Sequence, residues 1–252
     1  MKTAYWLIFI CATLLGQPTP AAVDTLKGTA NIEETIIYSW EDCNPEVSGE
    51  DCRRYNAGNV VNIGCGNTGP SYERRLLFMT PGWDETIPDS SELKLYSHLE
   101  IDTTDRDIFL YPLTTRFYEG NENAYNRGDY PNPDSGATWN HAYLDVGDGD
   151  STDWSSAGGD YTTGIACTTT VTGTGVYFSF RNFNRILNYW DTSGKNYGFI
   201  LINENVFPSN ISQKTFKSSE GDSIPLVLLY TAGGGGDGVN PRRRRIIKPS
   251  GR

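Results

Sequence analysis

The sequence SELKLYSHLEI, residues 91–101, alternates apolar and polar side chains, and this alternation decides the fold class. In an extended chain one face carries Leu93, Leu95, Ser97 and Leu99, and the other carries Glu92, Lys94, Tyr96 and His98. A period of two is typical of a β-strand that buries one face and exposes the other. We therefore expect a strand here.

Similar short segments recur along the chain between turn-forming residues. The segments expected as strands are 34–40, 59–64, 74–80, 92–100, 107–112, 176–180, 197–203 and 225–230. One helix is expected in residues 180–190, where apolar side chains recur at helical spacing. Residues 118–164 lack clear periodicity and are expected to form long loops with at most short strands. With 27 Gly, 15 Tyr and 13 Pro among 252 residues, the composition also favours an all-β protein.

The two ends of the chain differ from the middle. Residues 1–22 combine Lys2 with an apolar run and small residues, a pattern typical of a cleaved signal peptide. The run is shorter than the roughly 20 residues that a membrane-spanning helix needs, so no transmembrane segment is expected. Residues 231–252 hold a Gly-rich linker and a basic tail. We predict a secreted, extracellular or cell-surface protein with one β-sandwich domain at 23–230.

Charge is distributed unevenly along the chain. The formal net charge is −10. The tail holds six Lys or Arg and one Asp, and the leader holds Lys2, so residues 23–230 alone sum to −16. Such a body repels polyanions over long range, which argues against nucleic acid as a partner.

Four cysteines follow the leader: Cys43, Cys52, Cys65 and Cys167. An even number in an oxidising compartment indicates two disulfides. Of the three pairings, we favour Cys43 with Cys52 and Cys65 with Cys167, because neighbours in sequence close the shortest loop. A metal site is the alternative, but these spacings contain no CxxC pair.

Several motifs, taken in order, resemble the DNRLRE family of secreted modules, also called disaggregatase-related, part of which is grouped with carbohydrate-binding modules. They are ETIIYSW (34–40), NAGNVVNIGCG (56–66), ERRLLFM (73–79), SSELKLYSHLE (90–100), ATWN (137–140), GKNYGFILIN (194–203) and KSSEGDSIPLVLLY (217–230). The chain departs from the family at Met79 and Thr80, and in the insert DVGDGDSTD (145–153). The resemblance implies a jelly-roll-like antiparallel β-sandwich that accompanies polysaccharide-active or cell-surface proteins.

Aromatic side chains of the long loops are candidates for sugar binding. Flat rings stack on pyranose faces, and Arg, Asn and Asp side chains supply hydrogen bonds. Tyr143 and Tyr161 belong to this group of loop aromatics, whereas Trp139 of ATWN is expected to pack in the protein. The predicted ligand-binding residues are Arg116, Tyr118, Tyr125, Arg127, Tyr130 and Trp154.

The insert DVGDGDSTD offers clustered carboxylates with glycines between them. Ca²⁺ takes six to eight oxygen ligands, and a flexible loop with several Asp side chains can supply some of them. The bidentate Glu of an EF-hand is missing, and a solvated acidic turn is the alternative reading. The predicted calcium ligands are Asp145, Asp148, Asp150 and Asp153.

Adjacent Arg74 and Arg75 lie on an expected strand, so their side chains must point to opposite faces. A buried arginine needs a carboxylate partner, and a structural ion pair or a glycan contact are the two readings. Neither His98 nor His141 lies in a recognisable nucleophile motif, so we expect no catalysis.

The sequence therefore favours a non-catalytic module that recognises polysaccharide or a cell-surface glycan. A structural subunit of an extracellular assembly (a filament, an envelope layer or a virion surface), acting by self-assembly, is the alternative. A polysaccharide hydrolase or lyase is the third reading.

Overall fold

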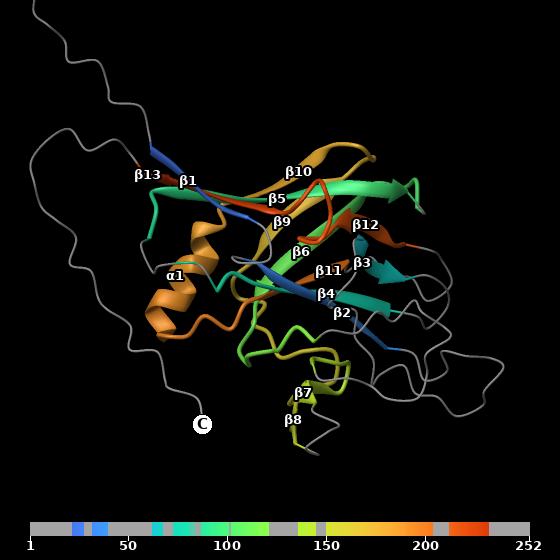
Figure 1. Ribbon diagram of the computed structural model, residues 1–252, viewed down its shortest axis with the longest axis vertical. Coiled ribbons are helices and arrows are strands. Elements are labelled where there is room, and N and C mark those ends of the chain that lie inside the picture. Colours follow the sequence, from blue (N-terminus) through green and yellow to red (C-terminus); the bar gives the residue numbers. More distant parts are fainter. Residues whose placement is uncertain are drawn as a thin grey trace, which may run out of the picture.

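A computed structural model of the chain describes residues 22–27, 32–39, 62–67, 73–81, 83, 87–100, 102–120, 136–144, 150–203 and 212–231. Within them lie thirteen β-strands and one helix (Figure 1). The strands are β1 (Ala22–Lys27), β2 (Glu33–Tyr38), β3 (Asn62–Asn67), β4 (Glu73–Met79), β5 (Ser90–Glu100), β6 (Arg106–Pro112), β7 (His141–Leu144), β8 (Ser151–Asp153), β9 (Cys167–Val171), β10 (Tyr177–Arg181), β11 (Phe199–Asn203), β12 (Lys214–Lys217) and β13 (Leu226–Thr231). The helix is α1 (Asn184–Ser193).

The strands form two layers of antiparallel sheet, so the predicted all-β sandwich is confirmed. One layer has the order β1-β13-β5-β10, and the other has the order β2-β4-β11-β6-β9. Strands β12 and β3 curl from β5 to β4 and join the layers at one side. The main core, with side chains from both layers, fills the space between them.

Strand β5 is the spine of the first layer. It pairs with β10 along one side and with β13 and then β12 along the other. The side chains of Leu93, Leu95 and Ser97 are buried, and Glu92, Lys94 and Tyr96 are more exposed. The alternation predicted for SELKLYSHLEI is therefore confirmed over the residues whose side chains are described.

In the second layer, β11 and the second half of β4 are buried on both faces. On β4, Leu76 and Phe78 face the main core, whereas Leu77 and Met79 face a second core on the outer side. This second core contains residues from 113–166, which we call the loop layer, and Figure 1 places β7 and β8 beyond the second layer as seen from β5. Because both faces are covered, β11 (FILIN) is buried throughout and shows no alternation.

Helix α1 begins four residues later than predicted. Phe180 and Arg181 belong to β10 and pair with Leu93 and Glu92, so strand pairing overrides the helical spacing of these residues. The helix ends at Ser193, and Gly194 follows in the left-handed conformation, with φ +67°. The buried side chains Ile186, Leu187 and Trp190 face the main core.

The predicted disulfide between Cys65 and Cys167 is wrong, because both are buried free thiols. Cys65 lies on β3 and Cys167 on β9, and strands β4, β11 and β6 intervene in the sheet order. The Cys167 thiol instead donates to the carbonyl of Asn182 at 3.3 Å. Cys43 and Cys52 lie outside the described residues, as do the leader up to residue 21 and the tail from 232.

No helix in the described ranges is both long and apolar enough to cross a membrane.

Five strands were not predicted: β1, β7, β8, β9 and β12. Strand β9 (CTTTV) is rich in threonine and buries only Cys167 and Val171 at its ends, and β12 (KTFK) holds a single large apolar residue, so neither shows a strong apolar alternation in sequence. Both are specified by their neighbours in the sheet.

Candidate functional site

An arginine on β4 fixes the loop layer to the second sheet. The Nε of Arg75 pairs with Glu73 Oε1 at 2.7 Å, and Nη1 donates to the carbonyl of Gly158 at 2.9 Å. The guanidinium lies over the Trp139 ring, 4.8 Å from its centroid. Arg74 points to the opposite face and lies over Tyr38. The predicted structural ion pair is confirmed for Arg75, and the contacts of Arg75 with Gly158 and Trp139 attach the loop layer to β4.

The outer side of the loop layer carries a group of side chains that we call the loop surface: Arg116, Tyr118, His141, Tyr143 and Asp153. The rings of Tyr118 and Tyr143 are tilted at 53° with centroids 4.8 Å apart. The Arg116 guanidinium lies 5.3 Å from the centroid of Tyr118. Tyr118 is 47% exposed, and among the described aromatic side chains Tyr177 is similarly exposed, at 41%.

Local alternation produces the loop surface. Phe117, between Arg116 and Tyr118, is fully buried in the second core, and so is Ala142, between His141 and Tyr143. A backbone hydrogen bond joins the two segments: the Tyr118 N–H donates to the Ala142 carbonyl at 3.3 Å. Burying the middle residue of each segment turns its neighbours outward, onto one surface.

A histidine and a carboxylate complete the loop surface. The Nδ1 of His141 lies 2.6 Å from Asp153 Oδ1 across the β7–β8 hairpin. This contact orients the imidazole and leaves its other nitrogen available to a ligand. Together with Arg116, the pair provides hydrogen-bond donors and acceptors beside the two tyrosine rings.

The structure brings together two of the six predicted ligand-binding residues, Arg116 and Tyr118. Trp154 is buried in the second core, and its Nε1 donates to the Thr138 carbonyl at 2.8 Å, so its ring faces no ligand. Tyr125, Arg127 and Tyr130 lie outside the described residues. His141 was not predicted as a ligand-binding residue. It lies two residues before Tyr143 in NHAYL, and residues two apart in an extended segment point to the same side, so this spacing could have indicated it.

The predicted calcium ligands are only partly described. Asp150 is exposed, Asp153 contacts His141, and Asp145 and Asp148 lie outside the described residues. Within the described ranges, no group of three or more His, Cys, Asp or Glu side chains is placed to hold a metal ion.

A cluster of glutamates, which we call the carboxyl cluster, adjoins the loop surface: Glu33, Glu34, Glu119 and Glu220. Glu119 directly follows Tyr118, and its Oε1 accepts a hydrogen bond from the Glu34 N–H at 3.0 Å. Burial raises the pKa of Glu34 to about 8, although hydrogen bonds from Ser219 oppose the rise. Burial also raises the pKa of Glu119 to about 7. Near neutral pH, Glu34 is therefore mainly protonated and Glu119 is partly protonated.

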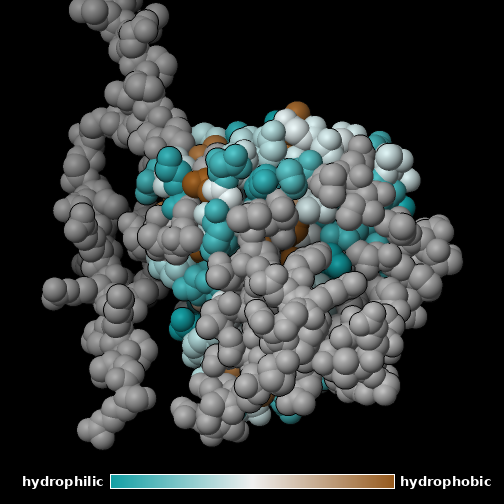
Figure 2. Space-filling view, turned by 45° about the vertical axis from the view of Figure 1, so that its right-hand side comes forward, coloured by the Kyte–Doolittle hydropathy of each residue, from teal (hydrophilic) through white to brown (hydrophobic). Residues whose placement is uncertain are grey.

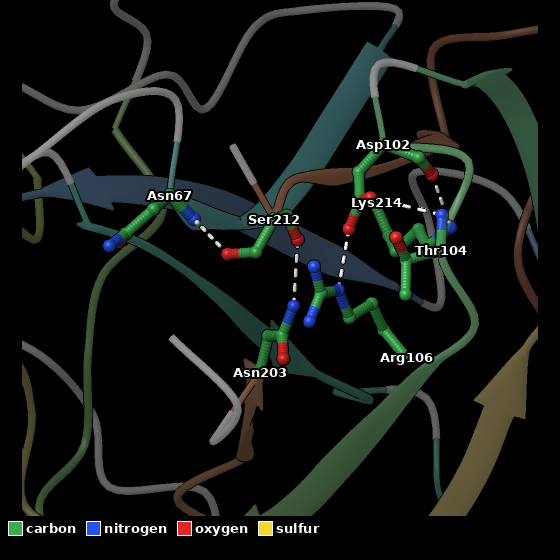
Figure 3. Close-up of polar contacts among 7 residues, drawn as sticks. All are labelled: Asn67, Asp102, Thr104, Arg106, Asn203, Ser212 and Lys214. Atoms are coloured by element: carbon green, nitrogen blue, oxygen red, sulfur yellow. Dashed lines mark hydrogen bonds and ion pairs between the residues drawn. The ribbon is translucent and has the colours of Figure 1, made fainter. Parts of the chain in front are cut away.

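A second polar network lies at the junction of β12, β3 and β11 (Figure 3). Arg106 Nε pairs with Asp102 Oδ2 at 2.5 Å, and Lys214 Nζ donates to the Asp102 carbonyl at 2.6 Å. Burial alone raises the pKa of Asp102, but hydrogen bonds from Arg106 and Thr104 hold it below its ordinary value. The remaining contacts in Figure 3 join Ser212 to the Asn67 N–H at 3.0 Å and to the Asn203 side chain at 2.7 Å.

We interpret the network of Figure 3 as structural. Its contacts link Asp102 with Arg106 and Lys214, and Ser212 with Asn203 and the Asn67 N–H, and Asn67, Asn203, Ser212 and Lys214 are almost fully buried. It fixes the turn after β5 to β12, at a distance from the exposed rings of the loop surface. Buried polar groups that pair with each other specify a local geometry.

No family model matches the chain, and no curated protein matches it. The resemblance to the DNRLRE family stays a prediction from the motifs alone.

Proposed function

We propose that this chain is a secreted, non-catalytic module that binds polysaccharide through the loop surface. The observation that carries the proposal is the exposed Tyr118 ring, tilted against Tyr143 and flanked by Arg116. Secretion rests on the leader-like residues 1–22, and the class of ligand rests on the chemistry of the loop surface together with the motif resemblance.

The chemistry of the loop surface fits a sugar. Tyrosine rings provide apolar faces for the C–H faces of pyranose units, and a phenol hydroxyl can donate or accept a hydrogen bond. Arg116, His141 and Asp153 surround the rings with donors and acceptors for sugar hydroxyls. Figure 2 shows one face of the molecule, and this face is mainly hydrophilic where it is described.

Packing beneath the loop surface supports binding. Phe117, Ala142 and Trp154 are buried beneath the loop surface, and Arg75 ties the layer to β4. A preformed site loses less conformational entropy when a ligand binds. We assign no catalysis, because Glu34, whose pKa burial raises to about 8, is only 1% exposed and out of reach of a polymer chain.

Replacing both rings, as Tyr118→Ala with Tyr143→Ala, is expected to weaken polysaccharide binding. Loss of two stacking rings removes about 1–3 kcal/mol of binding free energy, which corresponds to a loss of about five- to a hundredfold in affinity. Affinity electrophoresis in gels that contain cellulose, xylan, mannan, pectin or alginate derivatives, with and without added calcium, measures the retardation.

Tyr96→Ala with Tyr177→Ala is the matched control. These tyrosines also form a ring pair, at 5.1 Å, but on the outer face of β5 and β10. The proposal expects the control to be retarded like the wild type. Absence of retardation of the wild type in every gel contradicts the proposal, and so does full retardation of the Tyr118/Tyr143 variant.

A further inference from the structure

The carboxyl cluster joins three separate segments of the chain. Glu33 and Glu34 lie on β2, Glu119 follows β6 in the loop layer, and Glu220 lies in the turn between β12 and β13. Glu119 accepts from the Glu34 N–H, and Glu34 Oε1 in turn accepts from the Ser219 N–H. Glu34 is therefore the link between the loop layer and the turn at 218–221.

Glu34 is buried, and none of the described Lys or Arg side chains pairs with it. Its side chain is 1% exposed, and among the described residues Oε2 has no hydrogen-bond partner. Oε2 of Glu220 is likewise buried without a partner among them. The residues opposite Glu33 and Glu34 on β4 are the apolar Met79 and Phe78. An ionised carboxylate in such surroundings is strongly unfavourable, so the group stays neutral.

The charged neighbours strengthen this preference. Glu220 and Glu119 both raise the pKa of Glu34, and Glu220 and Glu33 raise that of Glu119. Arg116 lowers the pKa of Glu33, yet burial outweighs it and the pKa of Glu33 is raised. In the described part of the chain, the cluster thus has one nearby cation for four carboxyls, and that cation also lies over Tyr118.

We infer that Glu34 and Glu119 form a proton-operated clamp that closes the loop layer and the turn at 218–221 onto β2. While both carboxyls hold protons, the three segments stay in contact through the Glu34 backbone and side chain. When both protons are lost, negative charges in a buried space repel one another, and the segments separate. Because Glu119 directly follows Tyr118, opening of the clamp displaces the loop surface; this last consequence alone rests on the proposed function.

The clamp predicts how stability depends on pH. In the unfolded chain these carboxyls ionise near their ordinary pKa, whereas in the folded protein Glu34 and Glu119 keep their protons to about pH 8 and 7. Between the ordinary glutamate pKa and these raised values, the folded state therefore binds more protons than the unfolded state. Stability is therefore fully present below the ordinary glutamate pKa and falls as pH rises, by roughly 1 kcal/mol per pH unit for each carboxyl.

Hydrogen–deuterium exchange tests the clamp without any ligand. Peptides from 113–120 and 218–225 are followed at pH about 6 and about 9, with correction for the intrinsic pH dependence of exchange. For the wild type, we expect protection of both peptides to fall at least about tenfold at the higher pH. Peptides from β5 and β13 should change far less.

The variant Glu34→Gln with Glu119→Gln removes both titrating protons and keeps the size of the side chains. Its protection should stay within about threefold between the two pH values. Asp105→Asn, at an exposed carboxyl before β6, is the control and should behave like the wild type. If the double variant fails to fold, Glu119→Gln alone should halve the pH dependence of the unfolding free energy measured in urea.

Unchanged wild-type protection at both pH values overturns the clamp, and so does an equal loss in the glutamine variant. A functioning clamp in a protein that no polysaccharide gel retards contradicts the proposed function and leaves the clamp intact.

Discussion

Trp190→Ala is expected to lower the free energy of unfolding by about 3–5 kcal/mol. Trp190 projects from α1 into the main core, where its ring lies 5.6 Å from Trp83, 6.0 Å from Phe183 and 6.2 Å from Phe199. The alanine variant leaves a cavity at the end of the sandwich that α1 covers. Among the described residues its Nε1 has no hydrogen-bond partner, so we expect the loss to come from packing.

Urea denaturation monitored by circular dichroism measures this loss. Trp190→Phe keeps an aromatic ring in the space and should lose clearly less than the alanine variant. Asn188→Ala, on the exposed face of the same helix, should stay within about 0.5 kcal/mol of the wild type. A Trp190→Ala protein as stable as the wild type would contradict the position of α1 over the core.

Arg75→Ala is expected to lower the free energy of unfolding by about 2–4 kcal/mol and to loosen the loop layer. The change removes the ion pair with Glu73, the hydrogen bond to the Gly158 carbonyl and the contact with the Trp139 ring. Glu73 then remains half-buried without its partner. Limited proteolysis should cut within 113–166 first, while the two sheets resist.

Arg75→Lys distinguishes charge from geometry. A lysine ammonium carries the same charge, but it cannot reproduce the planar fork that binds Glu73 and Gly158 while it stacks on Trp139. We therefore expect the lysine variant to resemble the alanine variant. Wild-type resistance to proteolysis in Arg75→Ala would show that the loop layer is held by the second core alone.

The sequence predicted the sandwich well where one face of a strand is exposed. Alternation in SELKLYSHLEI identified β5 and its buried residues. Alternation was less informative for the second layer, because a strand that is covered on both faces, such as FILIN, carries apolar side chains on both sides. Phe180 was predicted to start the helix, but it pairs with Leu93 of β5 and belongs to β10. Pairing between distant strands is not visible in the local spacing of apolar residues.

The candidate site was only partly predictable. Arg116 and Tyr118 were identified by residue type, and the structure places them together. Trp154 has the same residue type as a sugar-binding ring, but its burial depends on a hydrogen bond to Thr138 that no spacing indicates. The link between Glu34 and Glu119 joins residues 85 positions apart, so it follows from the fold and not from any local pattern.

A nuclear magnetic resonance titration of the wild type locates the surface at which polysaccharide binds. An oligosaccharide released from the polysaccharide that retards the protein most is added in steps, and backbone amide shifts are recorded. We expect the largest shifts at Arg116, Tyr118, His141 and Tyr143. Shifts concentrated at Tyr96 and Tyr177, on the outer face of the first layer, would contradict this expectation.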